Sequence, residues 1–142
     1  MPIDYRVDSI QKVVFAKAKG RLTDRDVFDY QQQVWSAPGV AGFNELVDMT
    51  EVEEIVPPRS DRVRALANIS AEMDPPDHPS RFAIVASQDL AFGLGRMYGA
   101  YRELSPGSTK QVAVFRTRKA ALNWLGIEEQ NLDSPECHPK NT

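Results

Sequence analysis

Four carboxylates stand close together in the sequence and are the first candidates for acid–base chemistry. They are Asp48, Glu51, Glu53 and Glu54, in a segment that ends at the paired prolines 57 and 58. General acid–base catalysis needs a carboxyl group whose pKa is shifted by an enclosed site. A segment this acidic and polar indicates a solvated loop instead, so we assign no catalytic residue to it.

The other reactive side chains form no recognisable catalytic or metal site. His78 stands in a proline-rich loop, and His138 follows Cys137, the only cysteine, near the C-terminus. A nucleophilic cysteine needs a base held in place beside it, and a tail without periodic apolar residues does not provide one. The spacing of metal ligands is also missing. We therefore expect no enzyme activity, no metal and no cofactor.

The glycines at 93, 95 and 99 admit three interpretations. The preferred one is close packing of a helix on the sheet or on a neighbouring helix, because a glycine inside a helix usually has a packing reason. The second is a contact between helices in a dimer. The third, a dinucleotide-binding fingerprint, needs its glycines in the turn directly after a strand. We reject the third, because the preceding strand ends at Ser87, six residues before Gly93.

Length and charge set limits on the class of protein. A chain of 142 residues suits one domain with a real core. A formal net charge of -3 argues against a dedicated nucleic-acid-binding protein, which needs a basic surface. We find no signal peptide and no apolar run long enough to cross a bilayer. These features predict a cytoplasmic protein without a transmembrane segment.

The stretch from Arg81 to Arg102 organises the predicted fold. Residues 82–86 form a continuous apolar run, which is typical of a central strand covered on both faces. Asp89, or Ser87 before it, is the expected N-cap of the following helix. The spacing of its apolar residues predicts one buried face, made of Leu90, Leu94, Met97, Tyr101 and Leu104.

The remaining chain alternates strands with helices. Strands are expected near residues 3–8, 13–22, 45–50 and 111–116, and helices after Thr23, from 61 to 73 and from Thr117 to Gly126. The cations Lys17, Lys19 and Arg21 are expected to protect an exposed strand from aggregation, with a patch for anions or a membrane surface as the alternative. Residues 51–58 are expected to be a loop, and residues 128–142 a flexible tail.

This order predicts an α/β fold with one five-stranded mixed sheet. The elements run ββαβαβαβα, with an N-terminal antiparallel hairpin, parallel later strands and four main helices.

The chain resembles the STAS-type domains of anti-sigma factor antagonists, and more closely their SpoIIAA-like relatives. The resemblance covers about residues 1–127. It is carried by Gly20-Arg21-Leu22-Thr23, Leu46-Val47-Asp48-Met49-Thr50, Arg81-Phe82-Ala83-Ile84-Val85, Val114-Phe115 and Ala120-Ala121-Leu122-Asn123-Trp124-Leu125. These positions are mostly structural, so the resemblance concerns the fold more than the activity.

In regulatory STAS domains, a phosphorylated serine opens the helix after the third strand. Here the matching stretch reads Ile55-Val56-Pro57-Pro58, with prolines where that motif would place serines. Ser60 lies slightly beyond, and we interpret it as a helix N-cap and not as a phosphorylation site.

The resemblance also suggests where a ligand would bind. The SpoIIAA-like fold is compared with the lipid-binding CRAL-TRIO domain, which implies an apolar pocket between sheet and helices. Open α/β sheets also bind ligands at the carboxyl ends of parallel strands. The candidate ligand-binding residues are therefore Thr50, Ser87, Gln88, Phe92, Leu94, Met97, Tyr98, Tyr101 and Arg116.

Two functions follow from these observations. The first is a non-enzymatic regulatory or protein-interaction domain that associates with itself through a helix face. The alternative is a binding module for a small hydrophobic or lipid-like ligand. An enzyme ranks third, because it would need a reactive group that the sequence does not offer.

Overall fold

The computed structural model describes residues 2–128. Apart from Glu128, the expected flexible tail lies outside the described residues, as do Cys137 and His138. The elements in chain order are β1 (Ile3–Asp8), β2 (Val13–Leu22), α1 (Asp24–Trp35), the 3-10 turn η1 (Pro38–Val40), β3 (Asn44–Ile55), α2 (Ser60–Met73), β4 (Ser80–Val85), α3 (Asp89–Leu104), β5 (Lys110–Phe115) and α4 (Arg118–Leu125).

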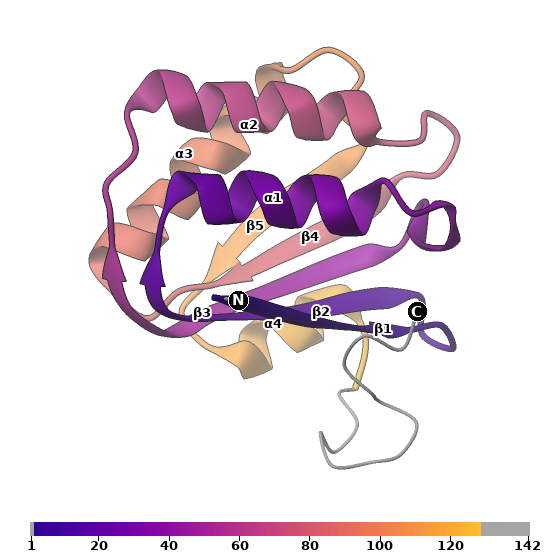
Figure 1. Cartoon of the computed structure of the whole chain (residues 1–142). Coiled ribbons are helices and arrows are strands. Elements are labelled where there is room, and N and C mark those ends of the chain that lie inside the picture. The colour runs from indigo at the N-terminus through magenta and orange to yellow at the C-terminus, as the bar shows by residue number, and fades with distance from the viewer. Residues whose placement is uncertain (1, 129–142) are drawn as a thin grey trace.

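The five strands form one mixed sheet in the order β1-β2-β3-β4-β5. The β1 and β2 strands pair antiparallel, and every later neighbour is parallel. This topology confirms the predicted fold class. The crossovers from β2 to β5 all advance in one direction, so a common right hand places their helices on one face. Figure 1 shows α1, α2 and α3 above the sheet and α4 below it.

Each face of the sheet has its own core. Under α1, α2 and α3 the buried apolar residues include Val14, Ala16, Tyr30, Val34, Val63, Ala67, Phe82, Ile84 and Tyr98. Under α4 they are Val13, Phe15, Leu46, Ala83, Val85, Ala121 and Leu125. Apolar residues therefore cover both faces of β2, β3 and β4, as expected for strands buried between helices.

The third strand is longer than predicted. The acidic residues from Glu51 onward continue β3 to Ile55 and pair with the end of β2. The prediction of an acidic loop there was wrong, because cations on β2 compensate the charges. Lys17 Nζ lies 2.8 Å from a Glu51 carboxylate oxygen, and Arg21 Nε lies 3.6 Å from Glu54. The β2 strand is not a sheet edge, because it pairs with β1 on one side and with β3 on the other. At least Lys17 and Arg21 face acidic neighbours across the strands.

The buried face of α3 also differs from the prediction. Ala91, Gly95, Tyr98 and Arg102 are buried, whereas Leu90, Met97 and Leu104 are among the exposed large apolar residues. The reason is a close approach of α3 to the sheet. A Cβ atom built on Gly95 would lie 3.1 Å from Cγ2 of Val114. This contact confirms the packing interpretation for Gly95, and a Cβ atom on Gly99 would likewise meet Val112, whereas Gly93 is exposed and packs against nothing.

Two helix N-caps lie one residue away from their predicted positions. The N-cap of α3 is Gln88 and that of α2 is Arg59, and neither side chain caps its helix. Ser60 is instead the first residue of α2. The expected caps hold at Thr23, which forms a capping box with Asp26, and at Thr117, whose hydroxyl accepts from the Ala120 N–H.

Candidate functional site

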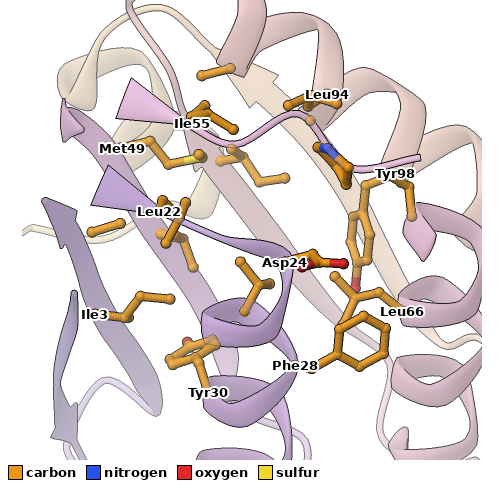
Figure 2. A pocket seen from close by; sticks show the side chains of 18 of the residues that line it. Ile3, Leu22, Asp24, Phe28, Tyr30, Met49, Ile55, Leu66, Leu94 and Tyr98 are labelled. Carbon is orange, nitrogen blue, oxygen red and sulfur yellow. The ribbon is translucent and has the colours of Figure 1, made fainter. Parts of the chain in front are cut away.

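A cavity of about 140 Å³ lies between the sheet and the three helices above it. The sheet provides its floor, α1, α2 and α3 provide its walls, and Figure 2 shows the side chains that converge on it. Its lining residues include Ile3, Leu22, Val27, Phe28, Tyr30, Val47, Met49, Ile55, Val63, Leu66, Phe82, Ile84, Ala91, Leu94, Gly95 and Tyr98. Almost all of these present apolar surface.

The cavity opens at the carboxyl ends of the parallel strands. Tyr30, Glu45 and Phe82 are buried at its inner end. Val56, which follows the end of β3, and Arg62 in the first turn of α2 are more exposed. This gradient places the mouth where open α/β sheets generally bind ligands.

An ion pair between α1 and α2 lies at the mouth. Arg62 Nε donates to Asp24 Oδ2 at 2.8 Å, and the side chains are 48% and 35% exposed. The guanidinium carbon of Arg62 also lies 4.4 Å from the centre of the Phe28 ring. The hydrogen bond from Arg62 lowers the pKa of Asp24 below its ordinary value.

A buried ionic network closes the inner end. Glu45 Oε2 accepts from the Tyr30 hydroxyl at 2.7 Å and from Trp35 Nε1 at 3.2 Å, while Oε1 accepts from Lys110 Nζ at 3.0 Å. The Lys110 ammonium also lies 3.1 Å from the centre of the Trp35 ring. Both carboxylate oxygens of Glu45 are therefore occupied by protein donors.

Burial shifts the acid–base properties of two members of this network. It raises the pKa of the Tyr30 hydroxyl well above its ordinary value, and the Glu45 carboxylate raises it further. Burial also lowers the pKa of the Lys110 ammonium, by more than the attraction of Glu45 raises it. The Tyr30 hydroxyl thus stays protonated and donates to Glu45 at neutral pH.

A second hydrogen-bond network fixes the hydroxyl group of Tyr98. Arg102 Nη1 donates to the Tyr98 hydroxyl at 2.6 Å, and Arg102 Nη2 donates to Asp74. The same Asp74 oxygen accepts from the Thr109 N–H at 2.9 Å. Because the tyrosine hydroxyls at 30 and 98 are engaged by protein partners, the interior presents mainly their apolar rings to a ligand.

The structure brings two of the predicted ligand-binding residues into this cavity. Leu94 and Tyr98 line it from α3. Phe92, Met97 and Tyr101 stand on the same helix but do not belong to its lining. The difference follows from the rotation of α3, which turns its small residues toward the sheet.

The residues predicted at the strand ends lie elsewhere. Arg116 Nη1 donates to the Ser87 carbonyl and to Asp89, and its guanidinium carbon lies 3.9 Å from the centre of the Phe92 ring. This forms an exposed cluster beside β4 and β5. Gln88 donates to the Val52 carbonyl.

Thr50 is not at a strand end. The β3 strand continues past it to Ile55, and the Thr50 hydroxyl donates to Asp48 Oδ1 at 2.6 Å. Asp48 also accepts from Arg118 Nη1 at 2.6 Å. Burial alone would raise the pKa of Asp48, but the hydrogen bonds from Thr50 and Arg118 outweigh it and hold the pKa below its ordinary value.

Sequence reasoning missed Tyr30, Glu45 and Arg62 as residues of the site. One of these residues, Glu45, could have been found from the alternation of side chains along a strand. Glu45, Val47 and Met49 must share a face. A glutamate on a helix-covered face indicates a buried partner, here Lys110 at a separation of 65 residues. No comparable signal links Arg62 to Asp24.

Neither metal binding nor membrane crossing finds support in the part of the chain that the structure describes. Residues 2–128 contain no group of three or more His, Cys, Asp or Glu side chains that could hold a metal ion. No helix among these residues is both long and apolar enough to span a bilayer.

Comparison with known proteins gives a likeness in fold. No family model and no curated protein matches the sequence. A similar solved structure is an uncharacterized protein of the DUF3478 family, with a SpoIIAA-like fold, from Shewanella loihica PV-4. It is 22% identical, with a TM-score of 0.48, over 80% of this chain and 83% of that chain.

Proposed function

We propose that this chain is a non-enzymatic binding module for a small hydrophobic molecule, held between the sheet and α1, α2 and α3. The observation that carries the proposal is the apolar cavity of about 140 Å³ with an open mouth. A cavity of about 150 Å³ lined by Leu, Ile and Phe stays dry and binds benzene. The matching volume suits one aromatic ring or a short alkyl chain.

Energetics support a filled cavity. Side chains around an unfilled cavity lack partner atoms on one side and lose dispersion contacts. A ligand that binds only the folded state and restores these contacts would raise the stability of that state. The buried carboxylates of Glu45 and Asp48 support a non-enzymatic role, because they already bind Lys110 and Arg118.

The test blocks the cavity from α3. Leu94→Trp places an indole in the cavity, and the matched control Leu104→Trp adds the same group on the same helix where the side chain is 80% exposed. We expect 1-hexanol to shift the amide resonances of lining residues in the wild type and in the control but not in Leu94→Trp. Equal responses in all three proteins would refute the proposal.

Native mass spectrometry of the gently purified protein provides a second readout. A small molecule retained at one-to-one stoichiometry in the wild type, and lost in Leu94→Trp, is the expected result.

A second function, self-association, is favoured by the outer face of α3. Leu90, Met97 and Leu104 are 49%, 37% and 80% exposed there. Leu90 and Leu104 each stand seven residues from Met97, with exposed Gly93 and Ala100 between them. An antiparallel second copy of α3 would set Met97 against its own equivalent and Leu90 against the second Leu104, so this face complements itself.

A further inference from the structure

Among residues 2–128, Arg62 is the only cation that lines the cavity. Its Nε donates to Asp24 Oδ2, and its guanidinium lies over the Phe28 ring. Within residues 2–128 its terminal nitrogens Nη1 and Nη2 donate no hydrogen bond. The side chain is 48% exposed, so these donors face solvent at the mouth.

We propose that the cavity takes a small anionic amphiphile, whose carboxylate binds the Nη atoms of Arg62 at the mouth and whose apolar part fills the interior. This inference rests on the proposed function. The ligand class is a monocarboxylic acid with a short alkyl chain or one aromatic ring.

The choice of a carboxylate follows from the geometry of the donors. Two terminal nitrogens of a guanidinium match the two oxygens of a carboxylate in a bidentate pair. Arg62 is also oriented in advance, because Asp24 holds Nε and Phe28 supports the planar group. A ligand carboxylate would therefore not have to order a flexible side chain.

The position of the charge agrees with the polarity of the cavity. A carboxylate at the mouth remains in contact with water and avoids the large cost of complete burial. At the inner end, the negative charge of Glu45 is already compensated by Lys110. The interior therefore has no free charge for the ligand, and its tail has to be apolar.

Asp24 has a second role in this arrangement. It orients Arg62, but its negative charge also lies close to any incoming carboxylate. Removal of that charge should strengthen the binding of an acid and leave the binding of a neutral analogue unchanged. A merely structural ion pair predicts no such selective gain.

The test compares hexanoate with 1-hexanol, which share an apolar chain and differ in the charged group. Affinities come from amide shifts in NMR titrations at pH 7 and low salt. In the wild type we expect hexanoate to bind about tenfold more tightly than 1-hexanol, as for one charge-assisted contact. In Arg62→Gln this preference should disappear while 1-hexanol still binds.

Arg64→Gln is the matched control. It makes the same change of charge on the same helix, but Arg64 is exposed and does not line the cavity. The preference for hexanoate should persist in this variant. In Asp24→Asn we expect the affinity for hexanoate to rise several-fold and that for 1-hexanol to stay constant.

The possible outcomes separate the two proposals. Equal affinities for hexanoate and 1-hexanol in the wild type would overturn the anionic ligand and leave the hydrophobic module standing. An equal loss of preference in Arg62→Gln and Arg64→Gln would overturn the site, because it would reflect net charge alone. If neither probe binds the wild type, both proposals fail.

Discussion

Gly95 on α3 lies directly against Val114 on β5. A Cβ atom at position 95 would come within 3.1 Å of Cγ2 and 3.3 Å of Cγ1 of Val114, and within 3.4 Å of Cγ2 of Ile84. The absent side chain lets the helix backbone approach the sheet and sets the depth of the cavity wall. Gly93, two residues away, has no atom within 4 Å of its position for a Cβ.

We expect Gly95→Leu and Gly93→Leu to have opposite effects on stability. A leucine at 95 has to displace Val114 and Ile84, and overpacking of this kind costs about 1–3 kcal/mol. A leucine at 93 meets open space and gains up to about 1 kcal/mol from helix propensity. Urea unfolding measures both. Equal stabilities of the two variants would contradict the close approach.

These glycines show how far the sequence predicts the fold. The change from strand to helix periodicity located α3 within a residue or two. The alternation of elements predicted which strands are parallel and which are antiparallel, whereas the order of the strands in the sheet came from the structure. The rotation of α3 was not predictable from apolar spacing, because its large apolar residues recur at helical spacing on another face and glycine carries little hydrophobic signal. The helix instead turns the face with Gly95 toward the sheet, because the missing side chain allows its backbone to approach closely there.

The site was less predictable than the fold. Leu94 and Tyr98 were found because they belong to a helix with a strong apolar pattern. The ion pairs of Glu45 with Lys110 and of Asp24 with Arg62 join residues 65 and 38 positions apart. Such pairs depend on which strands and helices become neighbours, and periodicity within one element does not carry that information.

The buried pair of Glu45 and Lys110 should behave non-additively. Glu45→Leu leaves a buried ammonium without its counter-charge, and loss of one partner of such a pair costs about 3–5 kcal/mol. Adding Lys110→Met removes the stranded charge, so the double variant should be more stable than Glu45→Leu alone. Urea unfolding of the four proteins in a double-mutant cycle measures the coupling. Additive effects would show that the pair is not coupled.

The stability of the protein should depend on Asp48 at acidic pH. The pKa of Asp48 is held below its ordinary value of 3.8, so its ionised form stabilises the folded state. This contribution is complete above about pH 3.8 and is lost as the pH falls through the lower folded-state pKa. The stability gap between the wild type and Asp48→Asn should therefore narrow below pH 3.8, as followed by urea unfolding.

The exposed Asp61→Asn is the control and should change stability little at any pH. A gap that stays constant into acid would contradict the role of Asp48.

The exposed face of α3 yields the last prediction, which concerns the oligomeric state. In an antiparallel pair of α3 helices Met97 faces its equivalent in the second copy, so Met97→Glu would place two like charges against each other in an apolar contact. We expect the wild type to show concentration-dependent dimerisation by sedimentation velocity, and Met97→Glu to remain monomeric at every concentration. The control Gln33→Glu adds the same charge at an exposed position of α1 and should leave the dimer intact.

Because Met97 does not line the cavity, Met97→Glu should still bind 1-hexanol. Self-association and ligand binding can therefore be tested separately, and a wild type that is monomeric throughout would remove the dimer while leaving the cavity proposal unaffected.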